Sequence, residues 1–139
     1  MAGTVVLGSL VSAHFASTTP KSHSQRLTIS SLTTADVFAT GITIPVGAVP
    51  LCVTMKVIQG GDGTTPVLSL GVAGTVAGYL ADSSVLAAAE GTVYKGAGAL
   101  MGVVVDTALN LIATGTITGV SVADVIVDIE VVYFATSIV

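Results

Sequence analysis

Apolar and polar residues alternate most clearly near the end of the chain, over Asp124–Ala135. One set of alternate positions is entirely apolar or aromatic: Val125, Val127, Ile129, Val131 and Tyr133. The intervening set is mixed: Ile126, Asp128, Glu130, Val132 and Phe134. Because successive side chains of a β-strand point to opposite faces, this period of two predicts a strand with one buried face and one outward face.

A second alternating run covers Leu51–Gln59 and is followed by a glycine-rich turn at Gly60–Gly63. Its inner face is expected to carry Leu51, Val53, Met55 and Val57. Other β-branched runs bounded by turn residues predict further strands. These are Thr4–Val11, Gln25–Leu32, Asp36–Ile44, Thr65–Val72, Gly98–Val105 and Leu109–Thr116.

One segment departs from the strand pattern. Asp82–Ser84 supplies capping side chains, Val85–Ala89 contains an alanine run, and a glycine follows at Gly91. Capping residues before such a run and a glycine after it are typical of a short helix or a single helical turn.

Seven or eight strands with so little helix leave no room for the crossovers of a parallel sheet. The chain is therefore predicted to be all-β, an antiparallel β-sandwich or barrel with at most one short helix. A jelly-roll-like sandwich is the preferred form. The sixteen glycines and four prolines, spread at short intervals, agree with many short strands and tight turns.

The first 24 residues differ from the rest, because an apolar stretch is followed by the polar, loop-like Ser17–Ser24. Two readings stay open: residues 1–24 are an arm that docks on a neighbouring subunit, or a first strand and its connection. Residues 25–139 form the sandwich domain in either case. The arm reading predicts partner-interface residues: Val5, Leu7, Leu10, Val11, His14 and Phe15.

Only 9% of the residues are charged, and the net charge is −4 with a single arginine, Arg26. This balance argues against nucleic acid as a partner. Uncharged stretches such as Val37–Met55 and Gly63–Ala81 are long enough for a membrane helix, but their prolines and glycines would break it. No membrane association is expected. A secretory signal is not expected either, because no Lys or Arg precedes Lys21.

The reactive side chains suggest no active site. His14 and His23 lack a third metal ligand at suitable spacing, and Cys52 on a strand is expected to behave as a small hydrophobe. Asp128 and Glu130 share a strand face with Asp124 and would suit calcium, although a solvated outer face explains them as well. No catalytic residue, metal or cofactor is predicted, and the chain is not expected to be an enzyme.

The order of segments nevertheless resembles a known group of proteins. The strand entry Ala35–Ile44 leads through a Pro-Val-Gly-Ala-Val-Pro turn into a long strand, and the chain closes with Gly115–Phe134, ending in Val-Val-Tyr-Phe. Between them lie Pro66–Gly71 and Gly78–Ala81. This pattern, over about residues 35–135, resembles the small virion structural proteins of tailed bacteriophages, which include capsid decoration (cement) proteins and head fibres.

The resemblance implies a non-enzymatic capsid accessory protein located on the virion. Such a protein would bind the major capsid protein at the capsid surface and stabilise the shell. It would also bind itself as a homo-oligomer, with a trimer favoured because capsid lattices offer three-fold junctions. An alternative is a receptor- or glycan-binding module of a tail or head fibre, for which the chain has few aromatic residues, three Phe and three Tyr. A small hydrolase or isomerase is a third reading, for which convergent His and carboxylate residues are lacking.

Overall fold

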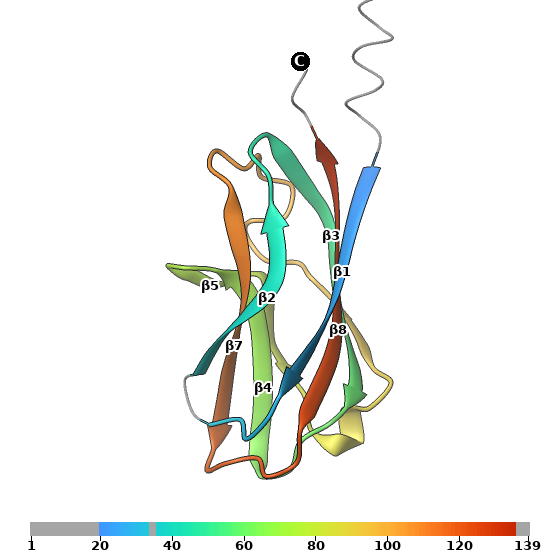
Figure 1. Ribbon diagram of the computed structural model, residues 1–139, viewed down its shortest axis with the longest axis vertical. Coiled ribbons are helices and arrows are strands. Elements are labelled where there is room, and N and C mark those ends of the chain that lie inside the picture. The colour runs from blue at the N-terminus through green and yellow to red at the C-terminus, as the bar shows by residue number, and fades with distance from the viewer. Residues whose placement is uncertain (1–19, 34–35, 136–139) are drawn as a thin grey trace, which may run out of the picture.

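The computed structural model describes residues 20–33 and 36–135, which form two packed β-sheets (Figure 1). The strands are β1 (Pro20–Ile29), β2 (Asp36–Ile44), β3 (Ala48–Gln59), β4 (Thr64–Val72), β5 (Thr75–Ser84), β6 (Val93–Lys95), β7 (Leu109–Thr118) and β8 (Val125–Ala135). A single 3-10 turn, η1 (Ala87–Ala89), lies between β5 and β6. Within the described residues, no helix is long and apolar enough to cross a membrane.

The first sheet has the strand order β1-β8-β3-β6 and the second has the order β2-β7-β4-β5. All the strand pairs are antiparallel, and they are nested: β1 pairs with β8, β2 with β7, β3 with β6 and β4 with β5. This is the pairing of a hairpin folded over on itself into two sheets, as in a jelly roll. The predicted all-β antiparallel sandwich with at most one short helix is confirmed.

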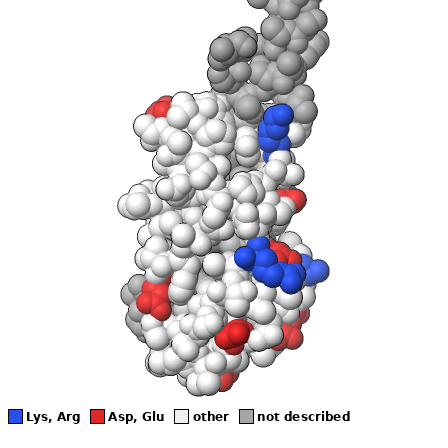
Figure 2. All heavy atoms as spheres, viewed as in Figure 1, with Lys and Arg blue, Asp and Glu red and all other residues white. Residues whose placement is uncertain are grey.

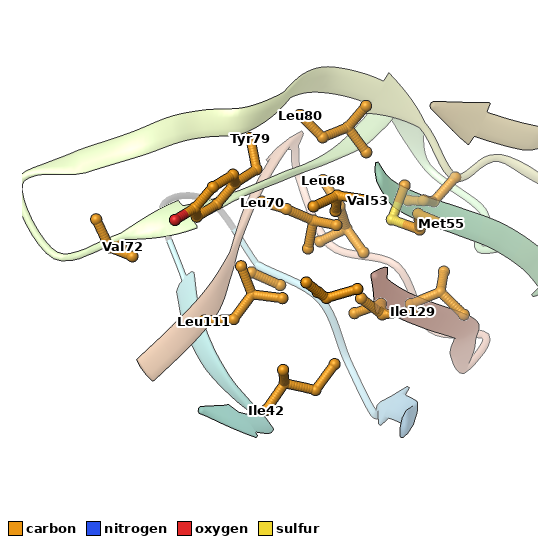
Figure 3. Close-up of a cluster of buried hydrophobic side chains, with 14 of the residues drawn as sticks. Ile42, Val53, Met55, Leu68, Leu70, Val72, Tyr79, Leu80, Leu111 and Ile129 are labelled. Carbon is orange, nitrogen blue, oxygen red and sulfur yellow. The ribbon is translucent and has the colours of Figure 1, made fainter. Parts of the chain in front are cut away.

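The core lies between the two sheets and is built from the inward side of each alternating strand. Figure 3 shows Ile129 of β8 and Met55 of β3 on one side, facing Leu111 of β7 and Ile42 of β2 on the other. The inner face of β8 is as predicted, with Val125, Val127, Ile129 and Val131 all buried. Burial of these branched side chains in close contact is the main force that holds the sheets together.

Several predicted strands agree with the structure within a few residues. Asp36–Ile44 is β2, Thr65–Val72 is β4 extended by one residue, and Leu109–Thr116 is β7 extended by two. Gln25–Leu32 corresponds to β1, which begins earlier, at Pro20, so that residues 20–24, expected as loop, pair with β8. The alanine run forms one 3-10 turn. Thr4–Val11 lies outside the described residues.

The prediction for the inner face of β3 is wrong at one residue. Val53, Met55 and Val57 are buried, but Leu51 is 41% exposed. The pairing of β3 with β8 shifts between Pro50 and Cys52, which marks a β-bulge. An extra residue in a strand reverses the alternation beyond it, so Ala48 and Pro50 point inward before the bulge and Val53 after it.

The predicted strand at Gly98–Val105 is also wrong. This segment is a loop of turns that lies against β5, with the Gly98 and Leu100 N–H groups donating to the carbonyls of Tyr79 and Gly78. Gly102 adopts a left-handed backbone, with φ of +77°, which suits glycine and breaks a strand. The strands that the sequence did not indicate, β5 and the three-residue β6, both precede this loop in the chain.

Candidate functional site

All four basic residues of the chain lie on strands of the first sheet. Lys21 and Arg26 are in β1, Lys56 is in β3 and Lys95 is in β6. Figure 2 shows the Lys and Arg side chains gathered on the flank formed by this sheet, while the rest of the view is largely uncharged. Of the eight acidic residues, only Asp128 and Glu130 share this sheet. Six carboxylates and no cation therefore remain for the rest of the chain.

The outer face of the first sheet carries two cross-strand rows of polar side chains. The strand register places Arg26, Asp128, Lys56 and Val93 in one row. It places Ser24, Glu130, Thr54 and Lys95 in the next row. Opposite charges alternate along the first row, which is the favourable arrangement for directly opposed strand residues. All of these residues except Lys95 line an open hollow of about 470 Å³.

Arg26 and Asp128 form a bidentate ion pair at the centre of this face. Arg26 Nε and Nη2 donate to the two Asp128 carboxylate oxygens at 2.7 and 2.9 Å. These hydrogen bonds lower the pKa of Asp128 and raise that of Arg26. Both side chains remain substantially exposed, at 57% for Arg26 and 42% for Asp128, so water screens the pair and its effect on stability is small.

The ion pair bears on whether the acidic residues of β8 are available to bind a cation. Asp128 is engaged by Arg26, and Glu130 accepts a hydrogen bond from the Ser24 hydroxyl at 3.3 Å. Within residues 20–33 and 36–135, no three His, Cys, Asp or Glu side chains form a group that could hold a metal ion. The outer face thus has the character of a solvated charged surface.

His23 and Cys52 do not form a nucleophile and base. Their partners on β8 are the neighbouring residues Val131 and Val132, whose side chains point to opposite faces of the sheet. His23 is paired instead along its own strand, with Nε2 at 3.4 Å from Gln25 Nε2. His14 and the other predicted interface residues, Val5, Leu7, Leu10, Val11 and Phe15, lie outside the described residues, so their role stays a prediction.

The outer face of the second sheet is neutral over β2, β4 and β7, whereas the edge strand β5 carries one exposed carboxylate, Asp82. The outward residues of those three strands that are not buried are Val37, Ala39, Thr43, Val67, Asn110, Ile112, Thr114, Thr116 and Thr118. Among these three strands only β2 has a charged residue, Asp36, and its carboxylate accepts hydrogen bonds from the Thr33 N–H and hydroxyl at the edge. The two sheets therefore differ sharply in the charge that they present to solvent.

The sequence indicated Asp62 only as part of a turn, but in the structure its carboxylate also holds two loops together. Its Oδ1 accepts hydrogen bonds from Ser121 Oγ at 3.0 Å and from the N–H groups of Val122 and Ala123 at 2.7 and 3.2 Å. These contacts join the β3–β4 turn to the β7–β8 loop. The hydrogen bond from Ala123, followed by that from Ser121, lowers the pKa of Asp62.

We expect Asp62→Ala to lower the melting temperature at neutral pH and to have little effect in acid. A carboxylate whose pKa is depressed by folding stabilises the fold above its unfolded pKa of about 4, and that contribution is lost as the pH falls through the folded value. Thermal melts from pH 7 to pH 3 would show the difference between wild type and variant shrinking below about pH 4. Asp82→Ala, which removes an exposed carboxylate of β5, is the control. A difference independent of pH would contradict the role of the carboxylate charge.

No protein-family model matches this chain, and no curated protein matches it. Solved structures do. A chain of the cyanophage Pam1 capsid asymmetric unit matches with a TM-score of 0.71 at 24% identity, covering 85% of this chain and 86% of that chain. A chain of the Ralstonia phage GP4 capsid matches with a TM-score of 0.61 at 17% identity, covering 84% and 86%. The acid-stable capsid of Helicobacter pylori bacteriophage KHP30 gives a TM-score of 0.59 at 16% identity, covering 87% and 97%.

The chain shares its fold with proteins of phage capsids. The resemblance to virion structural proteins that the sequence suggested is thereby confirmed at the level of the fold.

Proposed function

We propose that the protein is a non-enzymatic decoration (cement) protein of a phage capsid. In this role it binds the major capsid protein on the outer surface of the shell as a homo-oligomer, with a trimer expected, and stabilises the assembled lattice. The observation that carries the proposal is the match to chains of three phage capsids over nearly the whole of both chains. Those chains are therefore sandwiches of similar length, with little room for a further domain.

We further propose that the neutral face of the second sheet is the side that meets the shell. Burying charged side chains in an interface carries a desolvation cost that their new partners must offset. The face with Arg26, Asp128 and Lys56 would incur that cost, and its charges are already matched with one another. The Val and Ala side chains of β2 would lose little on leaving water, and each Thr hydroxyl of β2 and β7 would need one hydrogen-bond partner in the interface, without the larger cost of desolvating a charge.

Stabilisation of the shell then follows from mass action. A ligand that binds only the assembled lattice lowers its free energy by RT ln(1 + [L]/Kd), which is about 2.7 kcal/mol per site at a concentration a hundred times Kd. The gain disappears when the protein is diluted well below Kd.

The test uses purified shells that lack this protein. Adding the protein should lead to co-sedimentation with the shells and should raise the temperature at which they disrupt, in a concentration-dependent way. Val37→Asp places a charge on the neutral face at a residue that is 59% exposed, and it should weaken binding at least tenfold. Ser22→Asp, an exposed position on β1 of the charged sheet, is the control and should bind as wild type.

Two results would overturn the proposal. Absence of any binding to shells of the phage that encodes the protein would remove the decoration role, and selective binding to a glycan array would favour the receptor-binding alternative. Equal loss of binding in Val37→Asp and Ser22→Asp would refute the assignment of the shell-facing side.

A further inference from the structure

One end of the sandwich exposes apolar side chains that none of the described residues covers. Val46 in the β2–β3 loop is 57% exposed, and Val103 and Val104 in the loop before β7 are 48% and 50% exposed. The two loops are joined by backbone hydrogen bonds, from the Gly47 N–H to the Val105 carbonyl at 2.8 Å and from the Val105 N–H to the Ala48 carbonyl at 2.9 Å. We call Val46, Val103 and Val104 the apolar end.

A hollow of about 250 Å³ lies at this end, beside Val103 and Val104. Leu100, Leu109 and the aromatic ring of Tyr79 line it, together with one carboxylate, Asp106. Tyr79 is 1% exposed, and this burial raises its pKa. The hollow is large enough for one or two aliphatic side chains and offers them mainly carbon atoms.

The described part of the chain begins at the same end. Pro20 of β1 pairs with Phe134 of β8, and Phe134 pairs with Val49 of β3, next to the β2–β3 loop. Two strand spacings therefore separate Pro20 from Val49, a distance of about 10 Å. Figure 1 shows the start of β1 and the β2–β3 loop at one end of the molecule. Residues 1–19 thus leave the sandwich close to the apolar end.

The composition of those 19 residues complements the apolar end. They contain no charged side chain, and their apolar residues include Val5, Leu7, Leu10, Val11 and Phe15. Fully extended, they would reach about 60 Å from Pro20. Six or more aliphatic and aromatic side chains in one segment require a partner surface to leave water.

We propose that the apolar end of one copy binds residues 4–15 of a second copy. The sequence next to Pro20 favours the second copy over the same chain. Residues 16–19 are Ala, Ser, Thr and Thr, so Ser17 is the only one of the residue types that dominate tight turns, and Gly, Asn, Asp and Pro are lacking there. Thr19 precedes a proline, and this position disfavours the helical backbone that a turn requires. This residue composition disfavours a tight reversal onto the same sandwich directly before Pro20.

An exchange of this kind is heterologous, because the donated segment and the receiving end are different surfaces. Such contacts close into rings when the rotation between copies allows it. The inference rests on the homo-oligomer of the proposed function. It deepens that function by naming the contact that would hold the trimer together.

The first experiment measures the mass of the isolated protein by light scattering. Wild type is expected to have the mass of three chains, whereas Val104→Asp and a variant without residues 1–15 should each have the mass of one chain. Val37→Asp, the same substitution at an exposed valine far from this end, should keep the mass of wild type. The truncated variant leaves every described residue in place, so it decides the matter even if Val104→Asp folds poorly. A monomeric wild type, or trimers of both altered proteins, would overturn the inference.

The second experiment distinguishes exchange between copies from docking within one chain. In a Cys52→Ser background, Leu10→Cys protein is mixed with Val104→Cys protein and treated with a short bismaleimide. A cross-linked pair of chains supports the exchange. Cross-linking only within chains that carry both cysteines would overturn it in favour of the same chain. Replacing Val104→Cys by Val37→Cys is the control and should give no cross-link.

These results separate the inference from the proposed function. If the trimer depends on residues 1–15 but does not bind shells, the contact stands and the decoration role fails. If shells bind the protein while the trimer survives both changes, the decoration role stands and the contact fails.

Discussion

Ile129→Asp is expected to abolish the cooperative folding of the protein. Ile129 is 1% exposed and lies on β8, the strand that pairs with β1 on one side and β3 on the other. Across the core it faces apolar side chains of the second sheet such as Leu111 and Ile42 (Figure 3). No Lys or Arg is buried among the described residues, so a carboxylate placed there has no cation as a partner. It must remain charged without a partner or take up a proton, and either state costs several kcal/mol.

That cost is comparable to the whole stability of an ordinary domain, about 5–15 kcal/mol. Circular dichroism during heating should therefore show no cooperative transition for Ile129→Asp, and the protein should be poorly soluble. Ile129→Val keeps the apolar character and should cost only about 0.5–1.5 kcal/mol. Val37→Asp introduces the same carboxylate at a position 59% exposed and should melt close to wild type. A normal melt of Ile129→Asp would contradict the inward orientation of this face of β8.

The sequence predicted the strands in which alternation is regular and both faces have a distinct environment. In β8, branched residues at every second position meet the core, and Asp128 and Glu130 mark the outer face. The pattern of β2 and β7 is weaker, but each has three or more buried alternate residues. Their period of two survives folding because one face of each strand is fully covered, which fixes the register.

The errors arise where tertiary contacts replace that pattern. The bulge that turns Leu51 outward depends on how β3 pairs with β8, and no residue near it in the sequence indicates it. In the predicted strand Gly98–Val105, the valines Val103 and Val104 suggested burial, but they belong to the exposed apolar end. A run of β-branched residues indicates a strand only if another strand is available to pair with it, and here the segment packs on β5 through turns.

The charged surface illustrates a limit of the same kind. The sequence placed Asp128 and Glu130 together on one face, which the structure bears out in their shared outward position. The sequence could not indicate that Arg26 is the partner of Asp128. The two residues are 102 positions apart in the chain, and only the register of β1 against β8 brings them together. Without that register, a pair of carboxylates on a strand suits a cation site and a salt bridge equally well.

Gly98→Val is the second substitution for which we expect a large loss of stability. The loop containing Gly98 crosses β5 at very close range: a Cβ atom at this position would lie 2.3 Å from the Gly78 carbonyl oxygen and 2.6 Å from its carbon. Because these are backbone atoms, no side-chain rotation can relieve the contact. The loop or the strand has to move.

Moving the loop disrupts the hydrogen bonds that hold it, from the Gly98 N–H to the Tyr79 carbonyl at 3.1 Å and from the Leu100 N–H to the Gly78 carbonyl at 2.8 Å. Overpacking costs about 1–3 kcal/mol, and each lost hydrogen bond adds about 1 kcal/mol, so we expect a loss of about 3 kcal/mol or more. Urea unfolding should show a lower midpoint with an unchanged slope, which indicates a loss of stability without a change in the surface exposed.

Ala97→Val is the matched control, because it adds the same kind of branched side chain one residue away, at an exposed position. It should unfold within about 0.5 kcal/mol of wild type. Equal midpoints for Gly98→Val and Ala97→Val would show that the crossing with β5 is loose, contrary to the distances above. Since Leu100 and Val104 line the hollow at the apolar end, displacing this loop should also weaken self-association if that end receives the segment of a second copy. Gly98→Val should then dissociate at a higher protein concentration than Ala97→Val, under conditions in which both proteins remain folded.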